Sequence, residues 1–275
     1  MFSGITDVQR RLLDGWLGTW QIVDDYSWPL QDTTVLHVRT ADQDCIVKAS
    51  TDSHHIPREI AAHRHFLRSI PEAAPTLLHE SAADFVLVTR YLPGQIVEGS
   101  PSEWEPDTYR QAGSLLARLL VPGERSSDYS QRLRMQCTFD LDHATGLLPD
   151  SLLKELRASV ESITAHPVPV SFTHGDFQPR NWLIHDGTVS VIDFGRAEQR
   201  HWTSELFRLR NQQFVDRPDL EEAFFEGLGF TLDESDEQVW RLEQIHQSVA
   251  TLVSAHERAD AQSEKSGRAM VQAIA

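Results

Sequence analysis

The stretch THGDFQPRNWLIHDGTVSVIDFG, residues 173–195, constrains the fold of this chain more than any other part of its sequence. It contains two short apolar runs, NWLIH and VSVIDF, which have the length and composition of strands. Asp186 and Gly187 lie between them, a dipeptide that favours the tight turn of a β-hairpin. The sequence therefore predicts a hairpin in the second half of the chain.

Polar residues stand at both ends of this hairpin. His174, Asp176 and Asn181 precede or begin its first strand, and Asp193 lies at the end of its second. Burying a polar group beside a strand costs free energy unless the group is paired. This placement indicates a functional loop rather than an ordinary turn.

The chain's size and composition are those of a globular protein, because 275 residues can form one long domain or two lobes. Its longest apolar runs are too short to cross a bilayer, and its first residues lack a secretory pattern. Cys45 and Cys137 lie far apart, without a CxxC motif. We expect reduced thiols and a cytoplasmic location.

The net charge of −16 argues against a nucleic-acid partner, because a phosphate backbone would be repelled. It fits a cationic small-molecule substrate, although such acidity more commonly serves solubility. We expect no membrane partner, and a monomer or weak dimer.

The first part of the chain alternates strand-like and helical segments and predicts a small β-rich lobe over residues 1–93. The last of its strands is followed by Pro93 and Gly94, which end it. Strands are predicted at 19–28, 33–41, 44–50 and 84–92, and a helix at 57–70.

Residues 94–275 predict a mostly helical second lobe that carries the hairpin. Apolar residues recur at helical spacing in 108–121, in 150–165 behind a capping Asp150, and in 236–259. The polar segment after Asp260 is expected to fray. The predicted fold class is α+β with two lobes.

The polar residues of the hairpin match the requirements of phosphoryl transfer, which needs a carboxylate near the acceptor hydroxyl, oxygen ligands for Mg²⁺ and a cation for the phosphates. The kinase signature supplies these as H-x-D-x4-N, D-F-G and a strand lysine paired with a helix glutamate. Here the first motif spans 174–181 and the second spans 193–195. Lys48 lies in a predicted strand, and Glu59 follows eleven residues later in a predicted helix.

Each of these motifs is weak alone, but their order and context are informative together. They use one of only three lysines and one of only two asparagines in the chain.

The stretches HGDFQPRN and VIDFGRAE resemble the aminoglycoside phosphotransferase family, a branch of the protein-kinase-like fold that includes choline and homoserine kinases. The resemblance spans about Trp20 to Arg210. It implies a two-lobed protein-kinase-like fold that binds ATP and Mg²⁺ in a cleft.

The resemblance also implies roles for individual residues. Asp176 would be the catalytic base, and Asn181 and Asp193 would be the metal ligands. Lys48 would contact the phosphates and be oriented by Glu59.

The stretch LVTRYLPG resembles the segment that links the two lobes in this family. Thr89 would then lie at the back of the adenine pocket. The carbonyl of Arg90 and the amide of Leu92 would pair with the adenine edge.

The sequence departs from the family pattern in two places. Residues 24–38 contain no glycine, so Ser27 and nearby amides are the candidates for gripping the phosphates. Arg180 precedes Asn181, where the family often has a small or acidic residue. A structural ion pair is favoured for Arg180 over a contact with the transferred phosphate.

Four acids are candidates for binding a cationic substrate: Asp140, Asp142, Glu198 and Glu205. For each one alone, a solvated helix face or a cap is the more common role. Together they make a cationic substrate plausible, because acidic surfaces concentrate cations.

Other functional classes find less support. No H-E-x-x-H, Gly-Lys or G-x-S-x-G pattern occurs, so zinc proteases, P-loops and serine hydrolases are disfavoured. His63 and His65 lie two apart on a predicted helix, which separates their rings, and His174 is expected to orient the loop by hydrogen bonding.

The hypothesis is an ATP- and Mg²⁺-dependent phosphotransferase acting on a hydroxyl of a small molecule, most simply an aminoglycoside-type antibiotic. The alternatives are a choline, homoserine or sugar kinase, or a non-catalytic pseudokinase.

Overall fold

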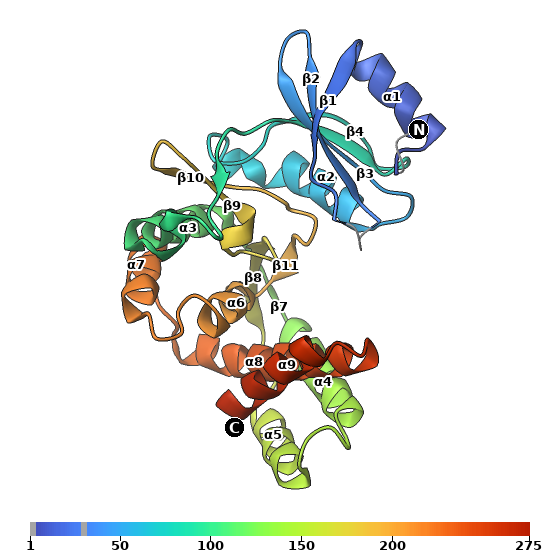
Figure 1. Ribbon diagram of the computed structural model, residues 1–275. Helices are drawn as coiled ribbons and strands as arrows, with labels where there is room; N and C mark the ends of the chain where they lie inside the picture. Colours follow the sequence, from blue (N-terminus) through green and yellow to red (C-terminus); the bar gives the residue numbers. More distant parts are fainter. Residues whose placement is uncertain (1–3, 29–31) are drawn as a thin grey trace. The chain divides into compact units, whose positions relative to one another are not determined.

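The structure is a computed structural model that describes residues 4–28 and 32–275. The chain forms two compact units, each assembled from distant segments (Figure 1). Unit 1 comprises Met1–Leu119, His174–Glu198 and Glu222–Gly229, and unit 2 comprises Leu120–Thr173, Gln199–Glu221 and Phe230–Ala275. These units differ from the two predicted lobes, and the division at residue 93 stays a prediction.

Unit 1 is built on an antiparallel sheet in the order β1-β2-β3-β5-β4. Its register pairs Leu36 with Val47 and Val38 with Cys45, so that apolar side chains share one face. Four of its five strands were predicted, and β4 was not. The strands are β1 (Trp20–Asp25), β2 (Thr34–Thr40), β3 (Asp44–Ala49), β4 (Leu77–Ser81) and β5 (Val86–Arg90).

Helix α1 (Asp7–Leu17) covers this apolar face and was missed by the sequence analysis. Its start is fixed by a capping box, in which Thr6 accepts from the Gln9 amide and the Gln9 side chain accepts from the Thr6 amide. Leu13 packs against the sheet. The T-x-x-Q pattern was the available signal for this helix.

Helix α2 (His55–His65) covers the opposite face of the sheet (Figure 1). Ile56 and Ile60 of α2 pack on Leu87, which points away from the α1 side because side chains alternate along β5. The register places Lys48 opposite Leu87, so Lys48 shares the face that α2 covers.

The predicted hairpin forms a second sheet of unit 1, in the order β10-β9-β6. Its turn has positive φ at both Asp186 (47°) and Gly187 (75°), as a two-residue hairpin turn of this type requires. The strands are β6 (Gln95–Ile96), β9 (Trp182–His185) and β10 (Thr188–Val191).

Helix α3 (Pro106–Leu119) supports this hairpin, and α7 (Pro218–Leu228) packs against α3. The Gln111 side chain donates to the Gly187 carbonyl and accepts from the Val189 amide, which fixes α3 against the edge of β10. Where α3 and α7 touch, a Cβ on Gly227 would lie 1.9 Å from the Arg110 carbonyl oxygen. A side chain there would push the helices apart.

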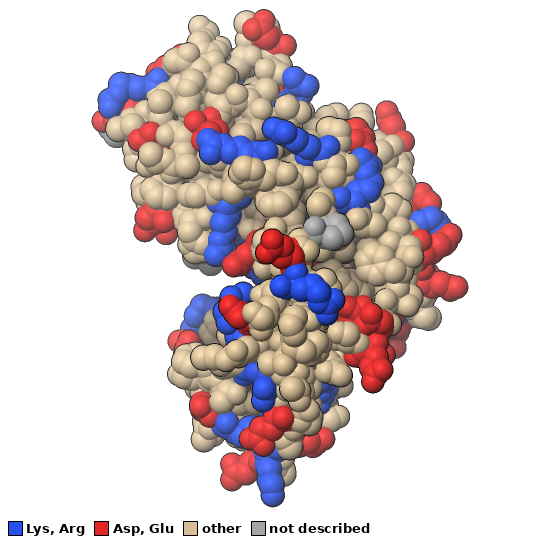
Figure 2. Space-filling model, turned by 180° about the vertical axis from the view of Figure 1, so that it is seen from behind, with Lys and Arg blue, Asp and Glu red and all other residues tan. Residues whose placement is uncertain are grey.

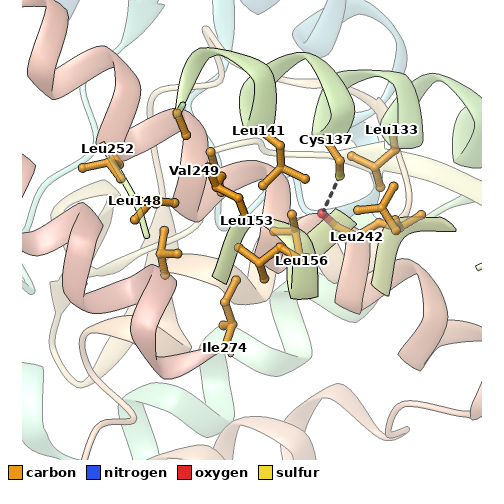
Figure 3. Packing of buried hydrophobic residues seen from close by; sticks show 14 of the residues in the cluster. Leu133, Cys137, Leu141, Leu148, Leu153, Leu156, Leu242, Val249, Leu252 and Ile274 are labelled. Atoms are coloured by element: carbon orange, nitrogen blue, oxygen red, sulfur yellow. Dashed lines mark hydrogen bonds between the residues drawn. The ribbon is translucent and has the colours of Figure 1, made fainter. Parts of the chain in front are cut away.

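Unit 2 contains a sheet of order β11-β8-β7 and a cluster of helices. The helices bury a shared apolar core, drawn in Figure 3, to which α4, α5, α8 and α9 contribute leucine side chains and other apolar groups. Its elements include β7 (Pro122–Ser126), α4 (Tyr129–His143), α5 (Asp150–Ser162), β8 (Val168–Thr173), β11 (Glu198–Arg200), α6 (Leu206–Asn211), α8 (Glu234–Glu257) and α9 (Ala261–Ala273).

Two expectations for unit 2 were wrong. The segment after Asp260 does not fray but forms α9, whose Gly267 lies so close to α8 that a Cβ would be 2.8 Å from the Leu252 Cα. Asp150 is the first helical residue of α5, and Pro149 occupies the cap. An acid in the first turn still interacts favourably with the helix dipole.

Acidic and basic side chains are interspersed on the face of the molecule shown in Figure 2. The net charge of −16 is therefore not gathered into one acidic patch on this face. In the described part of the chain, no helix combines the length and apolar composition needed to span a membrane.

The glycine contact between α3 and α7 generates a stability prediction. Gly227→Ala should lower the free energy of unfolding by about 2 kcal/mol or more, because the new methyl group meets backbone that cannot move without separating the helices. Gly15→Ala in α1, where nothing lies within 4 Å, is the matched control and should stabilise by about 0.5–1 kcal/mol. Urea unfolding measures both; equal effects of the two substitutions would contradict the packing described.

Candidate active site

Lys48, Glu59 and Asp193 meet in unit 1 although 145 residues separate the first from the last. The Nζ of Lys48 donates to Glu59 Oε1 (3.0 Å) and Oε2 (2.8 Å) and to Asp193 Oδ1 (2.8 Å). Glu59 is buried, Lys48 is nearly so, and the Asp193 side chain is 52% exposed. The group thus combines a buried ion pair with a carboxylate open to solvent.

Each element brings its side chain to this point for a local reason. Strand β3 presents Lys48 on the sheet face that α2 covers, and Glu59 lies between Ile56 and Ile60, which anchor α2 to that face. Asp193 follows Ile192, the first residue after β10. Its backbone φ is +66°, which is uncommon for a residue other than glycine.

The charges of this group shift one another's pKa values. The Lys48 ammonium holds the pKa of the Asp193 carboxyl well below its usual range. Burial alone would lower the pKa of Lys48, but the carboxylates of Asp193 and Glu59 outweigh it and raise that pKa above its ordinary value. Burial raises the pKa of Glu59, which Lys48 opposes. Lys48 is therefore a fixed cation throughout the neutral pH range.

Asp176, the predicted base, lies in a buried loop, and both oxygens of its side chain accept hydrogen bonds. Gln178 Nε2 donates to Oδ1 (2.5 Å), and Arg180 Nη2 donates to Oδ2 (2.5 Å). Arg180 forms an ion pair, as expected, and its partner is Asp176 itself. The contact of Gln178 with Asp176 was not predicted, although the two residues are only two positions apart.

Asn181 is tied to the same loop. Its Nδ2 donates to the Asp176 carbonyl oxygen (2.8 Å) and to Asp176 Oδ2 (3.2 Å). Because the amide nitrogen is engaged in this way, the remaining polar atom of the side chain, Oδ1, is the one suited to a cation.

His174 connects the Asp176 loop with the Asp193 loop, as expected of an orienting residue. Its Nδ1 accepts from the Asp176 amide (3.2 Å), and its Nε2 lies 2.9 Å from the Ile192 carbonyl oxygen. These two contacts require a neutral ring with the proton on Nε2. The Ile192 amide also donates to the Asn181 carbonyl (2.9 Å), which ties the loops a second time.

The donors that the resemblance assigns to Mg²⁺ have suitable chemistry, because Asp193 offers a carboxylate and Asn181 an amide oxygen. In residues 4–28 and 32–275, no group of three or more His, Cys, Asp and Glu side chains could hold a metal ion. A two-residue site that relies on phosphate oxygens and water for its other ligands is the usual solution for Mg²⁺.

The predicted nucleotide-binding segment lies along β5 and directly after it. Thr89 is buried, on the same sheet face as Lys48, since it pairs with Ile46 two residues before Lys48. Arg90 ends β5, and Leu92 follows after Tyr91, whose amide donates to the Asp44 carbonyl (3.0 Å).

The Ser27 side chain closes the turn between β1 and β2. Its Oγ accepts from the Val35 amide (2.9 Å), and its own amide donates to Asp25 Oδ1 (2.9 Å). Hydrogen bonding by the Ser27 side chain, and then by its amide, lowers the pKa of Asp25. Residues 29–31 of the expected phosphate-binding segment lie outside the described residues.

The four candidate substrate acids are divided between the units: Asp140, Asp142 and Glu205 lie in unit 2, and Glu198 lies in unit 1. Asp140 lies on α4, where His246 contacts it at 2.6 Å, and the Asp142 carboxylate forms an ion pair with Arg157 at 2.7 Å. Glu205 is buried, and Glu198 is exposed at the start of β11. The partners of the first two acids favour structural roles.

The chain matches a known family of sequences. The sequence profile described as "Phosphotransferase enzyme family" (APH) matches residues 30–241. No curated protein sequence matches the chain.

Solved structures share the fold over nearly the whole chain. Macrolide 2'-phosphotransferase MphH from Brachybacterium faecium is 16% identical, with 96% of this chain and 97% of that chain covered and a TM-score of 0.66. A thermostable mutant of aminoglycoside phosphotransferase APH(4)-Ia, in ternary complex with ADP and hygromycin B, is 14% identical, with 98% of each chain covered and a TM-score of 0.67. A choline/ethanolamine kinase family protein from Mesorhizobium loti is 18% identical, with 96% and 90% covered and a TM-score of 0.66. The predicted α+β, protein-kinase-like fold is confirmed.

The ion-pair group generates a prediction about pH. His63, one helical turn after Glu59, has a buried side chain whose Nε2 has no hydrogen-bond partner among the residues that the structure describes. Burial, followed by the nearby Lys48 charge, lowers its pKa from 6.5 to about 4. Below pH 6.5 the unfolded chain binds a proton at this histidine that the folded chain does not bind, so stability is lost as the pH falls toward 4.

His63→Met should therefore reduce the loss of unfolding free energy between pH 7 and pH 4, by up to about 3 kcal/mol. His65→Met, at an exposed position of the same helix, is the control and should keep the wild-type pH dependence. Urea unfolding at several pH values measures the effect; parallel curves for wild type and His63→Met would contradict the assignment.

Proposed function

The chain belongs to the phosphotransferase enzyme family, and we propose that it is an ATP- and Mg²⁺-dependent kinase that phosphorylates a hydroxyl group of a small molecule. The single observation that carries this proposal is the contact of the Lys48 ammonium with both Glu59 and Asp193. It joins a cation for phosphates to a carboxylate suited to a metal, in a loop that His174 ties to Asp176. Phosphoryl transfer depends on this kind of positioning and charge neutralisation.

In this proposal Lys48 would hold the nucleotide phosphates, and Glu59 would keep its ammonium in place. Asn181 and Asp193 would hold Mg²⁺, which when bound neutralises negative charge on the phosphates. Asp193 would then exchange its contact with Lys48 for the metal, which its 52% exposed side chain allows. Thr89, Arg90 and Leu92 would contact the adenine, as the resemblance implies.

Asp176 would orient the acceptor hydroxyl and accept its proton as the phosphoryl group transfers. Each carboxylate oxygen can accept more than one hydrogen bond, so the hydroxyl can bind beside Gln178 at Oδ1 or replace Arg180 at Oδ2. Gln178, Arg180 and Asn181 donate to this buried carboxylate and hold it in place until the acceptor arrives.

For the acceptor, we propose an aminoglycoside-type antibiotic. Support comes from the net charge of −16, which favours a polycationic molecule, and from the shared fold with an aminoglycoside phosphotransferase. Glu198 and Glu205 stay candidates for binding its amines, whereas the His246 contact of Asp140 and the Arg157 ion pair of Asp142 weaken the case for those two residues. The fold is equally that of a choline/ethanolamine kinase family protein, so a metabolic kinase for choline, homoserine or a sugar is the second candidate.

The experiment that tests the function is ADP release by the purified chain with Mg·ATP across a panel of aminoglycosides, macrolides, choline, homoserine and sugars. Growth of a sensitive host that expresses the chain, in the presence of the same drugs, is the parallel test. Acceptor-dependent ADP release supports the proposal, and its stimulation by choline alone would move the assignment to the second candidate. Tight Mg·ADP binding without turnover of any acceptor would indicate a pseudokinase.

Asp176→Asn should lower turnover by about 10²–10⁴-fold, because the base is lost, while ADP affinity in the presence of Mg²⁺ stays within about threefold. Asp193→Asn should weaken ADP binding only when Mg²⁺ is present. Asp186→Asn, in the same hairpin but with its side chain 93% exposed, is the control and should match wild type. Unchanged turnover in Asp176→Asn would remove the role assigned to this carboxylate.

A further inference from the structure

Three side chains of helix α2, spaced four residues apart, lie along the Asp193-Phe194-Gly195 loop, two of them in direct contact with it. Glu59 reaches Asp193 through Lys48, and the ring of His63 lies edge-on to Phe194 at 6.1 Å. The Nδ1 of His55 lies 2.8 Å from the Gly195 carbonyl oxygen. Residues at this spacing share one helix face, so one face of α2 lies along the loop.

His55 makes the contact to the backbone of the loop. A carbonyl oxygen can only accept, so the His55 Nδ1 carries the proton and donates. The approach is close, because a Cβ on Gly195 would lie 3.1 Å from the His55 Cβ. Glycine at position 195 therefore leaves room for the imidazole, and the two residues form a matched pair.

The loop needs such a contact because of its backbone. Asp193 has φ +66°, a conformation that typically costs about 1–3 kcal/mol for a non-glycine residue and persists only where its surroundings hold it. Before Asp193, Ile192 is held on both sides, by the Asn181 carbonyl and by His174. After Asp193, the Ala197 amide donates to the Phe194 carbonyl within the loop, and His55 supplies the hydrogen bond to another element.

The Lys48 contact also holds Asp193 in this structure, but it joins the side chains rather than the backbone. In the function proposed above, on which this inference rests, Lys48 would turn to the phosphates and Asp193 to the metal. The Lys48–Asp193 contact would then be lost when the metal binds, although metal binding requires the carboxylate to be accurately placed.

We propose that His55 is a positioning residue for metal binding: by holding the Gly195 carbonyl, it keeps the backbone of Asp193 in the conformation that presents its carboxylate to Mg²⁺. His55 does not touch the nucleotide or the metal in this role. It acts through the loop. Because His55 lies on α2, the metal site would form only when α2 is in the position seen here.

The test compares three variants. His55→Leu removes the donor at similar volume, and His55→Asn restores an N–H near the place of Nδ1. His54→Leu alters the exposed neighbouring histidine, whose ring lies 4.6 Å from that of His55, and serves as the matched control.

The first readout is ADP affinity, measured by calorimetry with Mg²⁺ and with EDTA. His55→Leu should weaken ADP binding about tenfold with Mg²⁺ and leave it unchanged with EDTA, which is the scale of one lost hydrogen bond. His55→Asn should stay within about threefold of wild type, and His54→Leu should match it. A merely structural role would weaken both binding modes together and would not be rescued by asparagine.

The second readout is hydrogen–deuterium exchange of residues 193–197 in the nucleotide-free protein, which does not depend on activity. His55→Leu should speed exchange in this segment and leave β9 unchanged, whereas His54→Leu should change neither. Wild-type exchange in His55→Leu, or an unchanged effect of Mg²⁺ on its ADP affinity, would overturn the inference and leave the proposed function standing. Wild-type ADP binding that is insensitive to Mg²⁺ would overturn the proposed function and this inference with it.

Discussion

The structure of unit 1 depends on one ammonium group shared between two carboxylates. Lys48 is largely removed from water and would be costly to place there without partners. Its two partners come from a helix and from a loop at the end of a hairpin, so satisfying this single charge fixes β3, α2 and β10 relative to one another. Loss of either partner would leave a buried charge less compensated, which is far more destabilising than the loss of a surface ion pair. The group that would hold the phosphates and the cation in the proposed function is thus arranged before any ligand binds.

The second constraint is the hydrogen-bonded frame around Asp176. A neutral His174 ring joins the Asp176 amide to the Ile192 carbonyl, and Gln178 and Arg180 occupy the two carboxylate oxygens. Preorganised polar groups of this kind need little rearrangement during reaction, which is how protein sites stabilise developing charge. The same frame explains why Arg180 differs from the small or acidic residue common in the family. Here it compensates the charge of a carboxylate that is only 5% exposed.

Much of the site could be predicted because its signals are local. The hairpin turn at Asp186-Gly187 and the spacing of its polar residues lie in one stretch of sequence. The α+β class followed from the order of strand-like and helical segments, and the protein-kinase-like fold followed from the family resemblance. The partners of Asp140 and Arg180 could not be inferred in the same way, since His246 lies 106 residues from Asp140 and the Arg180 contact depends on the loop's path. Helix α9 was missed because its sequence is polar, and it forms by packing Gly267 against α8 rather than by its own propensity. The sequence shows only that His55 lies four positions before Glu59. Its contact with Gly195 could not be predicted, because that contact depends on the loop lying along α2.

The central claim is that the group around Lys48 opens to form a metal–nucleotide site shared by Asn181 and Asp193. The most direct measurement is a crystal structure with ADP and Mn²⁺, with the metal located by its anomalous scattering. The account predicts an anomalous peak bonded to oxygens of both Asn181 and Asp193, at about 2.0–2.3 Å, with the Lys48 ammonium moved from Asp193 to the phosphates. A metal bound elsewhere, or an Asp193 still bonded to Lys48 beside a bound metal–nucleotide complex, would contradict it.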